Sequence, residues 1–176
     1  IDKYPFASDA NATDVGDTTQ ARNGSSGQSS TTHGYSSGGY APAAPGSSDT
    51  IDKFPFSVDA NATDVGDLTQ GRYSITGGQS STENGYTSGG FAPPRVTTID
   101  KFPFSTDANA TDVGDQTQGR NATAGQSSTT HGYATGGEPG GGNSNIIDKF
   151  TFSTDANATD VGDLTATTEG QAGQQV

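Results

Sequence analysis

The sequence predicts an all-β protein built from tandem repeats of about 48 residues. The nine residues Asp-Ala-Asn-Ala-Thr-Asp-Val-Gly-Asp occur four times, and each copy follows a short aromatic segment beginning with Ile, at positions 1, 51, 99 and 147. That segment alternates apolar and polar residues, which is the pattern of a strand with one buried face. No window shows helical periodicity of useful length. A period in this range is typical of architectures in which like units pack on one another.

The composition limits the size of any hydrophobic core. Leu, Ile, Val and Phe make up only 23 of the 176 residues, and the formal net charge is −12, a balance close to that of disordered chains. The apolar residues nevertheless recur at fixed positions in each repeat, and 14 residues are aromatic, which favours ordered repeats over disorder. A single repeat has too few large side chains to fold alone, so we expect stability to come from neighbouring repeats, a partner chain or bound ions.

Several classes of protein are disfavoured by the residues that are missing. Without Cys there is neither a disulfide framework nor a thiolate metal site. No apolar run reaches the roughly 20 residues of a membrane-spanning helix. The low pI, near 4.1, argues against nucleic acid as a partner, because phosphate binding needs clustered Lys and Arg. The absence of Met, even at position 1, leads us to expect a processed or excised piece of a protein.

Each repeat has four parts. The aromatic segment is a predicted strand, and the acidic nonapeptide is a predicted turn because it is dense in Asp, Asn and Gly. A Val-Gly-Asp-x-Thr segment then runs to Arg22, Arg72 or Arg120. Last comes a Gly-Gln-Ser-Ser segment, a further predicted strand, which ends at a Gly-Gly pair typical of a sharp bend. With about four short strands per repeat, the predicted units are residues 1–50, 51–98 and 99–146, followed by a partial repeat at 147–176.

The order of these parts resembles a known repeat family. Arg, Gly-Gln-Ser-Ser-x-x-x-Gly-Tyr-x-x-Gly-Gly, a variable loop, Ile-Asp-Lys-Phe and Val-Gly-Asp-Leu-Thr are similar to a degenerate kelch-type β-propeller repeat. The resemblance implies a blade in which one strand ends at the double glycine and two further strands follow the loop. The Trp of that family's last strand is absent here. The nonapeptide repeats also resemble arrays in structural and fibre proteins of marine and cyanobacterial tailed phages, which implies a virion role.

The number of repeats leaves the higher-order arrangement open. The chain has four copies of the first half of the repeat and three of the second half. Propellers typically contain four to eight complete blades. The chain is therefore part of a larger propeller, a linear stack of repeats, or a subunit of a homotrimeric fibre.

The acidic nonapeptide is the candidate ligand site. Alternate residues of a tight loop can turn their oxygens toward a hard cation such as Ca²⁺. The pattern is similar to the calcium loops of integrin-type propellers and to the first part of an EF-hand, although Asp stands at position six, where those loops have Gly. A plain turn whose side chains cap their own backbone amides is the alternative. The predicted calcium ligands are Asp9, Asn11, Thr13, Asp17, Asp59, Asn61, Thr63, Asp67, Asp107, Asn109, Thr111, Asp115, Asp155, Asn157, Thr159 and Asp163.

Asn-x-Ser/Thr triplets make a second kind of candidate site. They are acceptors for N-glycosylation where the chain is exposed to a glycosylating host. The candidate residues are Asn11, Asn61, Asn109, Asn157, Asn121 and Asn23.

No combination of residues points to an enzyme. His33 and His131 occupy equivalent positions, but the second repeat has Asn84 there, so a required general base is not indicated. The paired carboxylates belong to repeated positions and single out no acid and base pair. The Lys of each aromatic segment lies next to an Asp on the opposite strand face, so we expect Lys to pair instead with Asp residues of neighbouring repeats.

We therefore predict a non-enzymatic structural repeat protein of a phage virion fibre or appendage, or of an extracellular filament, located in the virion or outside the cell. Its expected partners are copies of itself or other fibre or virion subunits. Ile51, Phe54, Phe56 and their equivalents should be buried between units. The alternative is a propeller-type binding module, such as an adhesin or receptor-binding protein, whose variable loops after the Gly-Gly pairs recognise a surface glycan or a protein.

Overall fold

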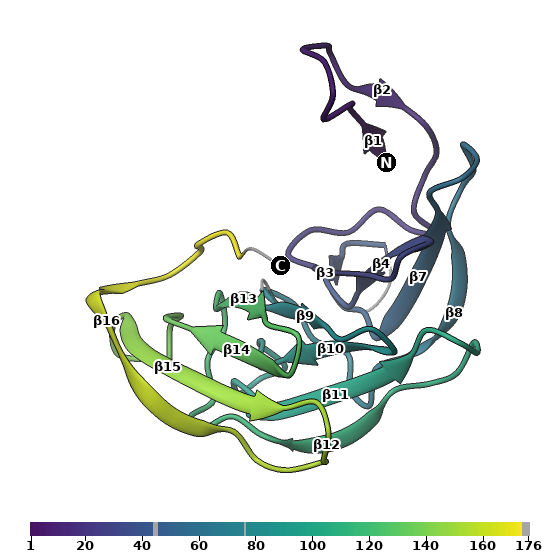
Figure 1. Ribbon diagram of the computed structural model, residues 1–176. Helices are drawn as coiled ribbons and strands as arrows, with labels where there is room; N and C mark the ends of the chain where they lie inside the picture. The colour runs from purple at the N-terminus through teal and green to yellow at the C-terminus, as the bar shows by residue number, and fades with distance from the viewer. Residues whose placement is uncertain (44–45, 76, 174–176) are drawn as a thin grey trace.

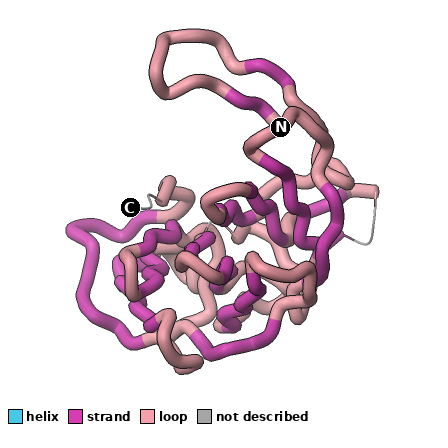
Figure 2. The backbone as a smooth tube through the Cα atoms, turned by 45° about the vertical axis from the view of Figure 1, so that its right-hand side comes forward, coloured by secondary structure: helices cyan, strands magenta, loops and turns pink. Residues whose placement is uncertain are grey.

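The computed structural model describes residues 1–43, 46–75 and 77–173, and within these ranges it consists of β-strands, turns and loops (Figure 2). The predicted all-β class is confirmed. No segment of the described chain forms a helix with the length and apolar character needed to cross a membrane.

Three four-stranded antiparallel sheets form the body of the molecule, and in each of them strands that follow one another in the chain are neighbours. The first sheet contains β3 (Ser26–Ser29), β4 (His33–Ser37), β7 (Thr50–Pro55) and β8 (Thr63–Asp67). The second contains β9 (Gly78–Ser80), β10 (Asn84–Ser88), β11 (Thr98–Pro103) and β12 (Thr111–Asp115). The third contains β13 (Ala124–Ser127), β14 (His131–Thr135), β15 (Ser144–Thr151) and β16 (Thr159–Thr168).

Two short hairpins complete the fold. Strands β1 (Asp2–Lys3) and β2 (Thr13–Asp14) pair with each other and protrude from the body, as Figure 1 shows at the upper right. Strands β5 (Tyr40–Ala41) and β6 (Gly46–Ser47) form a hairpin between β4 and β7. The three large sheets lie side by side, with β3, β9 and β13 toward the centre of Figure 1 and β8, β12 and β16 on the outside. None of the sheets in the described chain closes on itself.

Each large sheet combines the second half of one predicted unit with the first half of the next. Strands β3 and β4 come from residues 1–50, whereas β8 and nearly all of β7 come from residues 51–98. The predicted unit boundaries accordingly fall inside β7, β11 and β15. Corresponding residues keep the same register, since Tyr35 lies opposite Lys53, Tyr86 opposite Lys101 and Tyr133 opposite Lys149. A sequence repeat therefore shares its strands between two sheets.

The acidic nonapeptide is only partly a turn, which corrects the sequence-based prediction. Residues 59–62 belong to the loop that follows β7, but the remaining five residues form strand β8, which pairs antiparallel with β7. Gly66 in this strand has a φ of 152°, and a Cβ atom there would lie 2.5 Å from the carbonyl oxygen of Ala108. The Gly of the nonapeptide therefore serves the close approach of the next repeat rather than the turn itself.

The hydrophobic core lies between the sheets rather than within any one of them. One cluster of buried side chains joins the first sheet to the second and consists of Tyr35, Ile51, Leu68, Ile75, Phe102 and Ala110. The other joins the second sheet to the third and consists of Tyr86, Ile99, Phe150 and Ala158. This placement agrees with the expectation that repeats depend on their neighbours for stability.

Candidate functional site

The repeated residues meet at the contact between one sheet and the next, which we call the inter-sheet interface. It joins the β1–β2 hairpin to the first sheet, the first sheet to the second, and the second to the third. Three kinds of contact define it: a Tyr ring packed on two Phe rings, an ion pair between Lys and Asp, and a hydrogen bond from a backbone amide to the Asn side chain. These contacts use the Tyr, both Phe residues and the Lys of the repeat, together with the first Asp and the Asn of the nonapeptide.

The aromatic contact lies in the middle of the interface. The Tyr35 ring stacks on Phe104 with centroids 4.9 Å apart and meets Phe102 at 5.5 Å. At the next interface Tyr86 stacks in the same way on Phe152, at 4.9 Å, and meets the Phe150 ring at 5.4 Å. Burial between sheets raises the pKa of the Tyr35 and Tyr86 hydroxyls. The expected burial of the aromatic strands between units is confirmed here.

Ion pairs between neighbouring repeats lie at the outer edge of the interface. Lys3 pairs with Asp59, Lys53 with Asp107, and Lys101 with Asp155. The predicted pairing of Lys with an Asp of a neighbouring repeat is confirmed for these three Lys residues. Because the Asp partners are more than half exposed, each pair contributes little to stability by itself. Because the three pairs join equivalent positions, they set the same register between neighbouring repeats at each interface.

The Asn of the nonapeptide bonds to the backbone of the preceding repeat. The amide of Asp17 donates to Asn61 Oδ1 at 2.9 Å, and that of Asp67 donates to Asn109 Oδ1 at 3.1 Å. The amide of Asp115 donates to Asn157 Oδ1 at 3.1 Å. These bonds hold the turn of one nonapeptide against the last residue of the previous one.

The predicted calcium ligands are divided between two interfaces. The first and third residues of each later nonapeptide contact the preceding repeat, whereas the amide of the ninth residue contacts the following one at Asp17, Asp67 and Asp115. The fifth residues are exposed where strands β2, β8, β12 and β16 begin, and they are Thr13, Thr63, Thr111 and Thr159. In the described part of the chain, His, Cys, Asp and Glu form no group of three or more with metal-site spacing. Calcium binding stays a prediction.

Two other acidic side chains of the nonapeptide, Asp64 and Asp67, have local surroundings that the structure defines. Asp64 Oδ1 accepts from the amide of Gly66 at 3.2 Å, and the equivalent Asp residues do the same. Each of these bonds caps the backbone amide two residues further along the chain. Burial, with the nearby charges of Asp49 and Asp64, raises the pKa of the Asp67 carboxyl.

The candidate glycosylation residues differ in their surroundings. Asn61, Asn109 and Asn157 are exposed and use Oδ1 in the interface, while Asn11 and Asn23 are exposed near the start of the chain. Asn121 is half-buried, and its Oδ1 accepts from Arg95 Nε at 2.6 Å. Whether any of them carries a glycan stays a prediction.

A buried ion pair in each large sheet was not predicted from the sequence. Arg72 Nη2 lies 3.1 Å from Asp100 Oδ2, and both side chains are fully buried. Thr69 donates to the same carboxylate through its backbone amide, at 3.0 Å, and through its hydroxyl, at 2.7 Å. Burial lowers the pKa of Arg72, and the charge of Asp100 opposes this shift. The equivalent pairs are Arg22 with Asp52 and Arg120 with Asp148, each at 2.6 Å.

The sequence does contain a signal for this ion pair. Every Ile-Asp-Lys segment supplies one Asp, and one Arg precedes each Gly-Gln-Ser-Ser segment. Since buried charges in proteins must be paired, a repeated Asp and a repeated Arg in a thin core are natural partners.

A second contact that sequence reasoning missed involves the Gln of the Gly-Gln-Ser-Ser segment. Gln28 is buried in β3, and its Nε2 donates to the backbone oxygen of Tyr86 in the next sheet at 2.9 Å. Gln79 makes the equivalent bond to the backbone oxygen of Tyr133 at 2.8 Å. These bonds extend the inter-sheet interface to the centre of the molecule.

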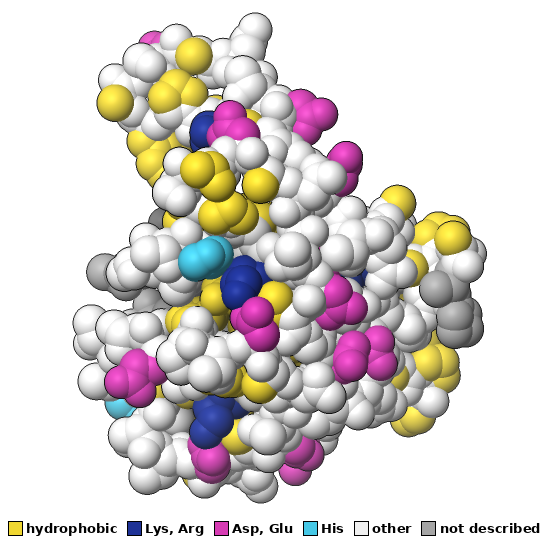
Figure 3. Space-filling view, turned by 90° about the vertical axis from the view of Figure 1, so that its right-hand side faces the viewer, with side chains coloured by type: hydrophobic (Ala, Val, Ile, Leu, Met, Phe, Trp, Pro, Cys, Tyr) yellow, Lys and Arg dark blue, Asp and Glu magenta, His cyan; other side chains and the backbone are white. Residues whose placement is uncertain are grey.

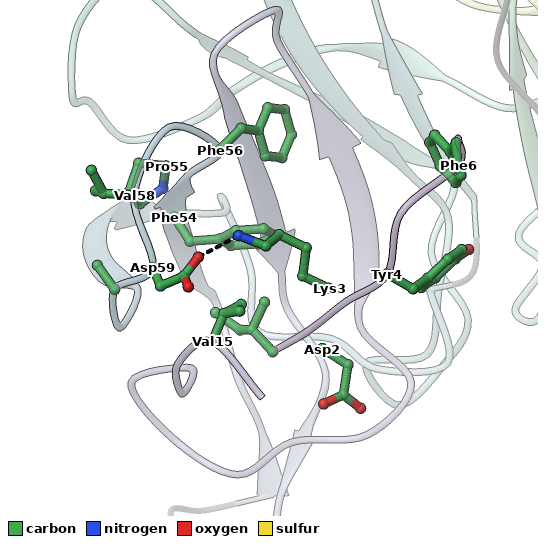
Figure 4. Close-up of a pocket in the computed structure, with 12 residues that line it drawn as sticks. Asp2, Lys3, Tyr4, Phe6, Val15, Phe54, Pro55, Phe56, Val58 and Asp59 are labelled. Atoms are coloured by element: carbon green, nitrogen blue, oxygen red, sulfur yellow. Dashed lines mark hydrogen bonds and ion pairs between the residues drawn. The ribbon is translucent and has the colours of Figure 1, made fainter. Parts of the chain in front are cut away.

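At the β1–β2 hairpin the interface lacks its Tyr. A cavity of about 230 Å³ lies between the hairpin and the first sheet, lined mainly by Ile1, Val15, Phe54, Phe56 and Val58 (Figure 4). Ile1, Val15, Phe54 and Phe56 are the sequence equivalents of residues that surround Tyr35 and Tyr86 at the other interfaces. Figure 3 shows hydrophobic side chains at the surface where the protruding hairpin meets the body. Phe56 remains 49% exposed, so its predicted burial is wrong at this end of the chain.

A scan against protein-family models gives no match for this chain, and a search of curated proteins finds no similar sequence.

Proposed function

We propose that this chain is a non-enzymatic structural protein whose repeats form propeller-like blades or a stacked array in a phage virion fibre or appendage, or in an extracellular filament. The observation that carries the proposal is the repetition of the inter-sheet interface. The Lys–Asp and Asn–amide contacts recur three times with the same partners. A protein that repeats its contacts instead of building one unique site is suited to a mechanical role.

The surroundings of the repeated polar residues support a structural role. The buried Arg and Asp residues bond to each other and to backbone groups of their own sheet, as Arg120 does with Gly136 O at 2.7 Å. The first Asp and the Asn of each later nonapeptide bond to the preceding repeat. His33 and His131 each lie 2.8 Å from the hydroxyl of the preceding Thr. The Arg, Asp and Asn contacts therefore support a role in assembly of the sheets.

The virion or extracellular setting is supported by the sequence. The nonapeptide array resembles those of phage structural proteins, and an acidic, Cys-free, Gly-rich chain suits a solvated fibre. Antibodies raised against the purified chain test the setting directly by immunogold electron microscopy of virions and extracellular filaments from the source culture. Label along fibres or filaments is the expected result. Label confined to the cell interior would overturn the proposal.

A binding module is the second candidate, because aromatic residues that follow two of the Gly-Gly pairs pack on Tyr73. Tyr40 meets Tyr73 at 5.4 Å, Tyr73 meets Phe91 at 5.4 Å, and Arg95 lies 5.5 Å from the Phe91 ring. Aromatic rings with one exposed face are common in sites that recognise glycans or proteins. Binding on a glycan array that is lost in Tyr40→Ala and kept in Phe6→Ala would favour this candidate.

A further inference from the structure

The N-terminal end of the molecule carries half of an inter-sheet interface. Tyr4 and Phe6 stand at the positions of the buried Phe pairs, yet they are 59% and 95% exposed. Asp9 and Asn11 are equivalent to the Asp and Asn that bind the preceding repeat elsewhere. Neither has an ion pair or a side-chain hydrogen bond to another residue of the described chain. Among the described residues, this end therefore presents a carboxylate and an amide oxygen without partners, beside two largely exposed aromatic rings that contact each other edge-on at 5.5 Å.

The opposite end, at the third sheet, carries the other half. Lys149 forms no ion pair within residues 1–43, 46–75 and 77–173, whereas the three equivalent Lys residues each have an Asp. In the part of the chain that the structure describes, no Phe pair covers Tyr133 as Tyr35 and Tyr86 are covered. A Cβ atom at Gly162 would meet nothing within 4 Å, while at Gly66 it would lie 2.5 Å from the next repeat.

The end at the third sheet also extends to the centre of the molecule. The amide of Gly170 donates to Ala122 O at 2.9 Å, as the amide of Ala122 donates to Ser74 O at 2.8 Å. Further on, Gly173 packs on Gly125 as Gly125 packs on Gly78. Residues 170–173 thus lie against the third sheet as residues 122–125 lie against the second. The third sheet therefore presents the same kind of contact surface as the second.

We propose that copies of this chain associate head to tail through these two ends. Lys149 of one copy pairs with Asp9 of the next, and Tyr133 packs on the second copy's Tyr4 and Phe6. The amide of Asp163 donates to Asn11 Oδ1. The proposal deepens the proposed structural function and depends on it. Its support is that every contact reproduces one already present between sheets of a single chain, with opposite charges facing each other.

A second copy is the partner that the geometry favours. Figure 1 places the β1–β2 hairpin and strand β16 far apart, so one chain does not bring its own two ends together. The two surfaces differ from each other, so the contact is heterologous and produces either a closed ring or an open chain of copies.

Charge reversal at the two ends provides the test. Sedimentation velocity over a concentration series should show reversible association of the wild-type chain. Lys149→Asp and Asp9→Lys should each weaken it by about tenfold or more, because like charges then face each other. An equimolar mixture of the two variants should associate as the wild type does, since each end again meets an opposite charge. Glu83→Lys, in an exposed turn, is the matched control and should change nothing.

The aromatic part of the contact has its own variant. Phe6→Ser should weaken association and leave thermal unfolding of the dilute chain unchanged, because the Phe6 ring is exposed within one copy. A wild-type chain that stays monomeric up to its solubility limit would overturn the head-to-tail contact. So would association that both charge reversals leave unaffected. Failure of the head-to-tail contact can be distinguished from failure of the proposed structural function, because immunogold labelling can still locate a monomeric chain in a fibre.

Discussion

The β1–β2 hairpin and the β11–β12 pair have nearly the same sequence and very different structures. Strands β1 and β2 are two residues long, whereas β11 and β12 contain six and five. Tyr4 is 59% exposed, and its equivalent, Phe102, is 2% exposed. Asp2 lies on the surface, while the equivalent Asp100 is fully buried against Arg72. Whether these side chains are buried therefore depends on the strands and rings next to the segment, because the segment sequences are nearly the same.

Phe102 is buried because its strand has a paired strand on each side and because the Tyr35 ring covers it. Strand β11 pairs with β10 on one side and β12 on the other, whereas β1 has β2 as its one partner among the described strands. The Tyr35 ring of the first sheet then covers Phe102 and Phe104. A two-stranded hairpin alone is marginally stable in water, and the short β1 and β2 agree with this.

Removal of the buried ion pair should have the largest effect. Arg72→Ala leaves Asp100 buried without its partner, which typically costs about 3–5 kcal/mol. Urea unfolding should show this loss as a lower midpoint with an unchanged slope. Lys53→Ala removes an ion pair with a largely exposed Asp and should cost about 1 kcal/mol or less. Equal effects of the two variants would contradict the distinction between buried and exposed pairs.

The aromatic positions test the comparison of the two regions directly. Phe102→Ala should lower the free energy of unfolding by about 3–5 kcal/mol, because it opens a cavity in the cluster around Tyr35. Phe6→Ala, at the equivalent of Phe104 in the hairpin, should change it by no more than about 0.5 kcal/mol. Differential scanning calorimetry on both variants measures the difference. A large loss in Phe6→Ala would mean that the hairpin is covered within one chain.

Close packing at the centre should have a smaller effect. A Cβ atom at Gly78 would lie 2.0 Å from Gly27 O, whereas at Gly27 it would meet nothing within 4 Å. Gly78→Ala should therefore cost about 1–3 kcal/mol through overpacking. Gly27→Ala is the matched control, with an expected change near zero. Thermal unfolding followed by circular dichroism compares the two, and equal melting temperatures would contradict the close approach.

The smallest predicted effect depends on pH. The folded state raises the pKa of Asp67, so it favours the protonated carboxyl more than the unfolded chain does. Stability from this group is complete below the ordinary pKa of Asp, near 3.9, and is lost as pH rises through the raised value. Asp67→Asn should thus be more stable than the wild type above that range and equal below it. Asp163→Asn, at an exposed equivalent position, controls for the loss of one charge.

The sequence predicts much of the fold because its signals are local and repeated. Alternation in Ile-Asp-Lys-Phe predicts β7, β11 and β15, and the Ser/Thr-rich segments before each Gly-Gly pair predict β4, β10 and β14. The Lys–Asp pairs between repeats were also predicted. These features depend only on residue type and period.

Other features depend on partners that a period does not reveal. The Thr-Asp-Val-Gly-Asp segment has the composition of a turn, yet it forms β8 because β7 offers it a free edge. Burial of Arg72 follows from where the segment after β8 crosses the second sheet, which composition does not indicate. The exposure of Phe56 results from a missing Tyr rather than from any property of its own repeat.

The offset between sequence repeat and sheet has a consequence for how such chains change length. Because each repeat supplies the outer half of one sheet and the inner half of the next, duplication or deletion of a whole repeat creates a junction identical to those already present. Unequal recombination between copies of the nonapeptide coding sequence would therefore lengthen or shorten the protein and leave both of its ends unaltered.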